Sequence, residues 1–140
     1  MLENLRELVG INSYENSDRI IGYLNKKFSP ISEDIIIIKN KENDNKSIVV
    51  GLNTKLRDVE PIVLSGHIDT VAPDKQKYNT NPLELTEIDD NAYGLGSIDM
   101  KSFTATILDN FAKIKALSCP HCYCFNYRWR NRFGLHRECY

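Results

Sequence analysis

A short apolar run that ends in a histidine and an aspartate restricts the fold of this chain more than any other feature. The apolar segment Ile62–Leu64 lies just before Gly66, which is the pattern of a buried β-strand. If extended geometry continues past the glycine, His67 and Asp69 project from one face and Ile68 from the other. The sequence therefore predicts a buried strand that presents an imidazole and a carboxylate together at its end.

A histidine followed by a carboxylate at this spacing suits a metal ligand and the residue that orients it. The carboxylate can accept the second imidazole N–H, which fixes the tautomer and raises the basicity of the ligating nitrogen. The alternative interpretation is an ordinary hydrogen-bonded pair at a strand end. The residues His67 and Asp69 alone do not decide between the two.

A second motif, Tyr93–Lys101, follows some thirty residues later and contains two glycines and an aspartate. Gly94 and Gly96 fit a turn that needs positive φ. The motif lacks the third glycine and the strand-to-helix context of a dinucleotide-binding fingerprint. Asp99 is a candidate metal ligand, and it could equally cap the helix that is expected to begin at Met100.

Taken together, the two motifs resemble the zinc-dependent deacylase and exopeptidase family that contains acetylornithine deacetylase, succinyl-diaminopimelate desuccinylase and related carboxypeptidases. The motifs that carry the resemblance are Ser65–Val71 and Gly94–Lys101, and Tyr78–Glu87 between them is also similar to the family. Leu95 and the continuation Ser102-Phe103 are most similar to acetylornithine deacetylase. The resemblance covers roughly residues 1 to 117.

The resemblance implies a site with two zinc ions, for which cobalt can substitute. His67 is similar to a ligand of one zinc, Asp99 to the carboxylate that bridges the two, and Asp69 to the catalytic-site residue that orients the histidine. Two such ions activate a bound water and polarise a scissile amide carbonyl. The implied reaction is hydrolysis of the N-acetyl amide of a small amino acid, as in arginine biosynthesis. A desuccinylase or carboxypeptidase activity is the alternative within the family.

The sequence departs from the family in its ligand set. The resemblance implies a general base in a Glu-Glu pair, later ligands and an inserted lid domain that makes the family homodimeric. None of these occurs in the 140 residues, and no Glu-Glu pair is present. Zinc sites normally have at least three protein ligands. We therefore expect this chain to be catalytically incompetent and marginally stable, with an apolar face and sheet edges exposed.

The composition changes abruptly after Leu117, which divides the chain into residues 1–117, the start of the catalytic domain, and a tail, residues 118–140. All four cysteines and the single tryptophan lie in the tail, together with four of the seven arginines, whereas every lysine precedes it. With suitable codons, a one-nucleotide shift turns residues 121–125 into an apolar strand and residues 128–132 into an Asp-x-Glu-x-Gly pattern. We therefore predict that the tail is a frameshifted segment.

The alternative interpretation takes the tail as it stands. Cys119 and Cys122, followed by His136 and Cys139, have a spacing that could hold one structural zinc. With Trp129 and the tail arginines, the segment would then be a non-enzymatic zinc-knuckle binding module.

Charge and hydropathy exclude several partner classes. The formal net charge of −1 offers no electrostatic basis for binding nucleic acid or an anionic membrane, and no apolar run is long enough to span a bilayer. The start Met1–Asn4 lacks the basic and apolar regions of a secretory signal, so we expect a cytoplasmic protein. A small N-acyl amino acid is the partner that the resemblance implies.

The hydrophobic periodicity alternates between helix and strand, which predicts an α/β fold with a mixed sheet flanked by helices. Lys101, near the start of the last predicted helix, is expected to face solvent. The expected helices are residues 2–9, 16–28 and 100–117, and the expected strands are 34–39, 47–52 and 60–65, with a hairpin at 83–94.

Overall fold

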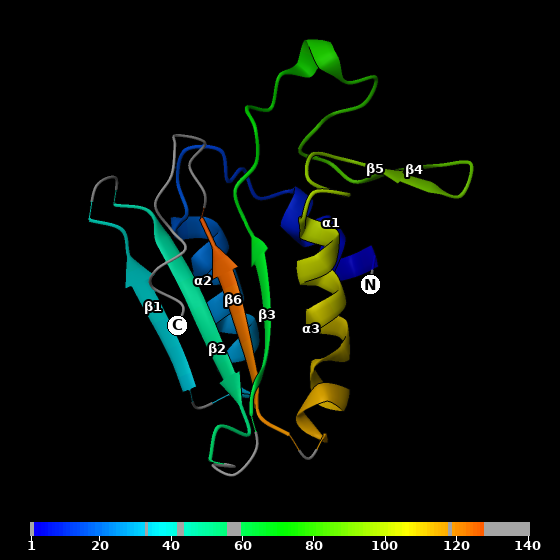
Figure 1. Cartoon of the computed structure of the whole chain (residues 1–140). Coiled ribbons are helices and arrows are strands. Elements are labelled where there is room, and N and C mark those ends of the chain that lie inside the picture. The colour runs from blue at the N-terminus through cyan, green and yellow to red at the C-terminus, as the bar shows by residue number, and fades with distance from the viewer. Residues whose placement is uncertain (1, 33, 42–43, 56–59, 118, 128–140) are drawn as a thin grey trace.

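The computed structural model describes residues 2–32, 34–41, 44–55, 60–117 and 119–127. Both predicted element types are present but they do not strictly alternate: two helices come first, five strands follow, and a third helix precedes the last described strand (Figure 1). The elements are α1 (Leu2–Val9), α2 (Asp18–Phe28), β1 (Asp34–Lys39), β2 (Lys46–Leu52), β3 (Ile62–His67), the 3₁₀ turn η1 (Lys75–Lys77), β4 (Thr86–Ile88), β5 (Asn91–Tyr93), α3 (Lys101–Lys115) and β6 (His121–Asn126).

Four strands form one mixed sheet in the order β1-β2-β6-β3. β1 pairs with β2 and β2 with β6 in antiparallel register, whereas β3 and β6 are parallel. β4 and β5 form a separate hairpin that lies beyond the carboxyl end of β3 (Figure 1). The predicted α/β class with a mixed sheet is confirmed.

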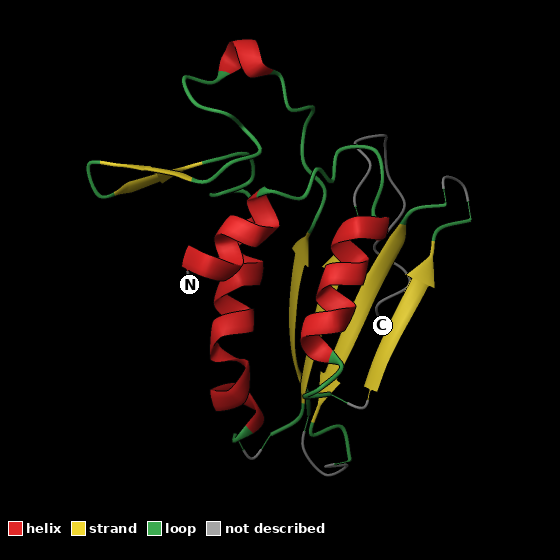
Figure 2. Ribbon diagram, turned by 180° about the vertical axis from the view of Figure 1, so that it is seen from behind, coloured by secondary structure: helices red, strands yellow, loops and turns green. Residues whose placement is uncertain are grey.

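The helices cover one face of this sheet (Figure 2). Each helix buries an apolar stripe at three- and four-residue spacing, which in α2 consists of Ile20, Ile21, Leu24 and Phe28. Phe28 of α2 packs against Phe111 of α3 and Phe125 of β6, with ring centroids 4.6 Å and 5.5 Å apart. This aromatic contact joins both helices to the centre of the sheet.

β6 comes from the segment after Leu117 and is nevertheless a central strand. It is paired with β2 on one side and with β3 on the other. Among the described residues, the compositional boundary therefore does not separate two folded units. The out-of-frame origin of residues 118–140 stays a prediction, and residues 128–140 lie outside the described part of the chain.

Two expectations about burial are wrong. The segment Ile62–Leu64 forms the predicted strand, but its side chains are 50%, 51% and 36% exposed because β3 is the last strand at one edge of the described sheet. Lys101 does not face solvent: it is 1% exposed and donates a hydrogen bond from Nζ to the carbonyl oxygen of Ile11 at 2.8 Å. A long side chain can bury its methylene groups where its ammonium finds a buried carbonyl acceptor.

Candidate functional site

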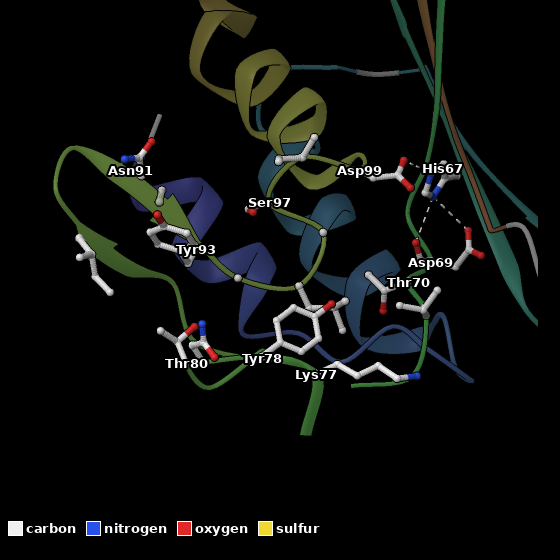
Figure 3. A pocket seen from close by; sticks show the side chains of 18 residues that line it. His67, Asp69, Thr70, Lys77, Tyr78, Thr80, Asn91, Tyr93, Ser97 and Asp99 are labelled. Atoms are coloured by element: carbon white, nitrogen blue, oxygen red, sulfur yellow. Dashed lines mark hydrogen bonds and ion pairs between the residues drawn. The ribbon is translucent and has the colours of Figure 1, made fainter. Parts of the chain in front are cut away.

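The candidate site lies where β3 ends and α3 begins. His67 is the last residue of β3, and Asp99 lies two residues before the first residue of α3. The two motifs are thus brought together across thirty-two residues of sequence, and their side chains converge (Figure 3). A site at the carboxyl end of a strand is the usual location in α/β folds.

His67 lies between two aspartates. Its Nε2 is 2.8 Å from Oδ1 of Asp99, and its Nδ1 is 3.0 Å from the carbonyl oxygen and 3.5 Å from Oδ1 of Asp69. Ile68, between them in sequence, is buried at 1% exposure on the core side. The alternation predicted for residues 67–69 is therefore observed.

Both ring nitrogens of His67 face oxygen acceptors, which favours the protonated imidazole. The hydrogen bonds to Asp69 first, and to Asp99 in addition, raise the pKa of His67 to about 9 against the opposing effect of burial. The side chain of Asp69 is 9% exposed and that of Asp99 is 68% exposed. The first aspartate therefore has the enclosed position of an orienting group, and the second is open to a ligand.

The backbone around the site requires glycine where α3 approaches β3. A Cβ atom on Gly66 would lie 2.7 Å from the ring of Phe103 and 3.1 Å from Cε of Met100. Gly96 has a φ of +82°, and a Cβ there would lie 2.9 Å from Cδ of Lys101. Close packing of the first turn of α3 therefore sets where Asp99 lies relative to the end of β3.

Lys101 links this turn to the rest of the fold. Its backbone N–H donates to the carbonyl oxygen of Gly96 at 2.9 Å, while its Nζ binds Ile11 beyond α1. Burial lowers the pKa of Lys101 to about 8. Sequence reasoning missed this contribution because a charged residue in the first turn of a helix is ordinarily exposed.

A pocket of about 900 Å³ opens beside His67 and Asp99. Its walls include the loop with Lys77 and Tyr78, the β4–β5 hairpin with Tyr93, and the glycine turn before α3 (Figure 3). A cavity of this size suits a small molecule. No local sequence pattern predicts that Tyr78 and Tyr93 line the same pocket. Tyr78 follows the η1 turn and Tyr93 ends β5, so only the folded chain brings the two side chains to one cavity.

The residues present fit a metal centre in part. One imidazole nitrogen and one carboxylate point toward each other in the pocket, and these are ligand types that zinc prefers. Among the described residues, however, no three histidine, cysteine, aspartate or glutamate side chains are placed to hold one ion. His67 and Asp99 are therefore candidates for only part of a ligand set, and we derive no step through a metal.

The alternative zinc site of the tail, which includes Cys119 and Cys122, stays a prediction. Sγ of Cys119 is 3.5 Å from Nε2 of His121, whereas Sγ of Cys122 is 4.0 Å from Sγ of Cys124. The two proposed ligands His136 and Cys139 lie outside the described residues.

Comparison with known proteins identifies the family. Residues 63–122, which include both motifs, match the sequence model described as peptidase family M20/M25/M40. The chain belongs to this family. It is 37% identical over 109 residues to the acetylornithine deacetylase of Buchnera aphidicola from Schizaphis graminum, covering 76% of the chain and 28% of that protein. It is 47% identical over 55 residues to the acetylornithine deacetylase of Yersinia pseudotuberculosis, covering 39% of the chain and 14% of that protein.

Solved structures of the family share the fold. Human carnosine dipeptidase 1 superposes with a TM-score of 0.74 at 18% identity, over 89% of the chain and 31% of that structure. The M20 family metallo-carboxypeptidase Sso-CP2 from Sulfolobus solfataricus gives a TM-score of 0.70 at 16% identity, over 89% of the chain and 30% of that structure. The chain thus spans about a quarter to a third of the length of these larger proteins. Across the described segments, no helix is long and apolar enough to cross a membrane.

Proposed function

We propose that this chain is the first part of a metal-dependent amidohydrolase that removes the acetyl group from a small N-acetyl amino acid, as acetylornithine deacetylase does. The observation that carries the proposal is His67 held between Asp69 and Asp99 in the wall of the pocket. The identity to two proteins named acetylornithine deacetylase supports the substrate class. A role in arginine biosynthesis would follow from that substrate. A homodimer of the complete enzyme is what the family resemblance implies, and a cytoplasmic location is what the N-terminal sequence favours.

Each residue has a distinct proposed role. Asp69 binds Nδ1 of His67, which leaves Nε2 as the nitrogen that faces the pocket. His67 and Asp99 would then hold the metal, with Asp99 in the bridging role that the family resemblance implies. When bound, the ions would activate a water and polarise the amide carbonyl. The Asp99 side chain lines the pocket and is 68% exposed, which supports a bridging role.

We further propose that residues 1–140 alone do not catalyse the reaction. His67 and Asp99 give one imidazole and one bridging carboxylate, fewer than the three protein ligands of a catalytic zinc. The sequence also contains no Glu-Glu pair to supply the general base that the family resemblance implies.

The frame of the tail is a separate proposal. Central strands of a sheet are usually apolar on both faces, and the shifted reading of residues 121–125 would supply such a segment at the position of β6. Sequencing the gene from Leu117 onward in all frames tests this. A downstream frame with a Glu-Glu pair supports the frameshift, and stop codons in every frame would contradict it.

A chimera tests the activity. Residues 1–117 would be joined to the remaining part of the Buchnera acetylornithine deacetylase, loaded with zinc or cobalt, and assayed with N-acetylornithine and with N-succinyl-diaminopimelate. We expect hydrolysis of the acetyl substrate, lost by about 10³-fold or more in His67→Ala and Asp99→Ala, since each removes a metal ligand. Lys75→Ala, in the η1 turn, is the matched control and should retain activity.

Three outcomes are informative. Preference for the succinyl substrate would favour the desuccinylase alternative. A folded, metal-loaded chimera without activity on either substrate would contradict the proposed reaction. Activity that survives His67→Ala would contradict the proposed site.

A further inference from the structure

The wall of the pocket carries charged side chains on different elements. His67 ends β3 and lies between the carboxylates of Asp69 and Asp99, whereas Lys77 ends the η1 turn. Among the described residues that line this pocket, Lys77 is the one lysine or arginine. The pocket therefore contains a cationic side chain that the proposed metal site does not use.

The ammonium group of Lys77 is held only by an exposed ion pair. Its Nζ is 3.4 Å from Oδ2 of Asp74, and the two side chains are 78% and 39% exposed. Solvent screens a pair of this kind, so it contributes little to stability. Lys77 can therefore exchange Asp74 for an anionic group of a ligand in the pocket at little cost to the fold.

Thr70 contributes a hydroxyl group to the same pocket. It lies between Asp99 and Lys77 in the close-up view (Figure 3). Its Oγ1 is shielded from water and has no hydrogen-bond partner among the described residues. A buried hydroxyl without a partner costs free energy, and nearly all such groups in folded proteins are paired. An oxygen of a ligand in the pocket can supply the acceptor that this hydroxyl lacks.

We propose that Thr70 and Lys77 bind the α-carboxylate of the substrate while its scissile amide lies at His67 and Asp99. Hydrogen bonds from an ammonium or a hydroxyl to a carboxylate are charge-assisted and stronger than bonds between neutral groups. The inference rests on the proposed function, because an N-acyl amino acid carries a carboxylate beside the amide that is cleaved. Lys77 would repel a substrate that presents an ammonium end to this part of the pocket, as an aminopeptidase substrate does.

Binding of N-acetylornithine and of its α-amide to the metal-free chain, residues 1–140, tests the proposal by NMR titration. The amide lacks only the negative charge of the acid, and zinc is left out because a bound ion would itself attract a carboxylate. We expect the acid to bind about 5-fold more tightly than the amide, with a preference that added salt reduces.

Substitutions assign this preference to the two side chains. Lys77→Met and Thr70→Val should each reduce it by about 3-fold or more, because each removes a donor to the carboxylate. Lys77→Arg and Thr70→Ser keep a donor and should retain the preference. Lys75→Met is the matched control: Lys75 lies in the same η1 turn but does not line the pocket, so the preference should be unchanged.

Equal affinity for acid and amide, or no binding of either, would overturn the proposal. So would a preference that survives in the double variant Thr70→Val/Lys77→Met, or one that Lys75→Met reduces as much as Lys77→Met does.

The zinc-loaded chimera separates this inference from the proposed function. If it hydrolyses N-acetylornithine and Lys77→Met raises KM with kcat unchanged, both are supported, since uniform binding of the substrate has been lost. Hydrolysis with an unchanged KM in Lys77→Met would overturn the carboxylate site alone. A preference for the acid in the metal-free chain, without hydrolysis by the chimera, would contradict the proposed reaction and support the carboxylate site.

Discussion

The two faces of the four-stranded sheet differ sharply, although both consist largely of apolar residues. On the helix side, Phe28 and Phe125 are fully buried and stack on each other. On the other side and along the β3 edge, Ile36 is 61% exposed and Val63 is 51% exposed. Apolar alternation therefore specifies the strands, and the helices decide which face becomes the core. An exposed apolar face of this kind marks an interaction or aggregation site.

The largest expected difference between the faces is in stability. Phe28→Ala removes a side chain that contacts both Phe111 and Phe125, so we expect it to lower the free energy of unfolding by about 3–5 kcal/mol. Ile36→Ala, on the open face, should change it by less than about 0.5 kcal/mol. Urea denaturation followed by circular dichroism measures both.

If Phe28→Ala does not fold, Phe28→Leu provides a milder test on the same side, expected to cost about 1–2 kcal/mol. Equal costs for the Phe28 and Ile36 substitutions would contradict the assignment of one covered and one open face.

Glycine substitutions test the packing of the covered side next to the site. A Cβ on Gly66 would meet Phe103 at 2.7 Å, so Gly66→Ala should destabilise the fold by about 1–3 kcal/mol. Gly22 lies on the exposed side of α2, where an added Cβ would have no atom within 4 Å, and Gly22→Ala should stabilise by about 0.5–1 kcal/mol. Thermal unfolding of both variants measures the two changes in stability. A change of the same sign in both variants would contradict the close packing assigned to Gly66.

Much of the fold was predictable because it depends on local patterns. The apolar stripe of α2 and the isoleucines of β1 are recognisable from spacing and residue type alone. The meeting of His67 with Asp99 was predicted only through the family resemblance, since thirty-two residues separate them. The roles of Asp69 and Asp99 as orienting and bridging groups stay predictions.

The failures have a common physical cause. Ile62–Leu64 were predicted to be buried and are exposed, whereas Lys101 was predicted to be exposed and is buried. Neither outcome is visible in the local sequence, because burial depends on which elements pack against a segment. β3 is an edge strand in the described sheet, so its apolar residues stay exposed. Lys101 has a carbonyl acceptor from residue 11, ninety positions away, which no local pattern reveals.

The buried ammonium makes the covered side sensitive to pH. Burial lowers the pKa of Lys101 to about 8 from an unfolded value of 10.5, so the unfolded chain binds more protons between these values. The contribution of Lys101 to the free energy of unfolding therefore rises with pH in that window, by about 1 kcal/mol between pH 8 and pH 9. Lys101→Met should lack this rise. The difference between wild type and variant, measured by urea denaturation at both pH values, isolates the contribution of this one group.

An exposed ion pair on the outer side of the helices should change stability in the same direction with pH, in a lower pH range and more weakly. Oε2 of Glu7 accepts hydrogen bonds from Nζ of Lys27 and from the hydroxyl of Tyr23, both at 2.8 Å, which ties α1 to α2. The bond to Lys27, and then that to Tyr23, lowers the pKa of the Glu7 carboxyl. Its contribution is therefore present above the ordinary carboxyl pKa and is lost as the pH falls through the lowered value.

Because the Glu7 and Lys27 side chains are 46% and 36% exposed, solvent screens the pair, and Glu7→Gln should cost only about 0.5 kcal/mol at neutral pH. The cost should shrink in concentrated salt and vanish in acid, where wild type and variant both carry a neutral group. Urea titrations of the two proteins at neutral and acidic pH measure this. A cost that persists unchanged in acid would mean that Glu7 stabilises the helix pair through packing, and that its charge contributes nothing.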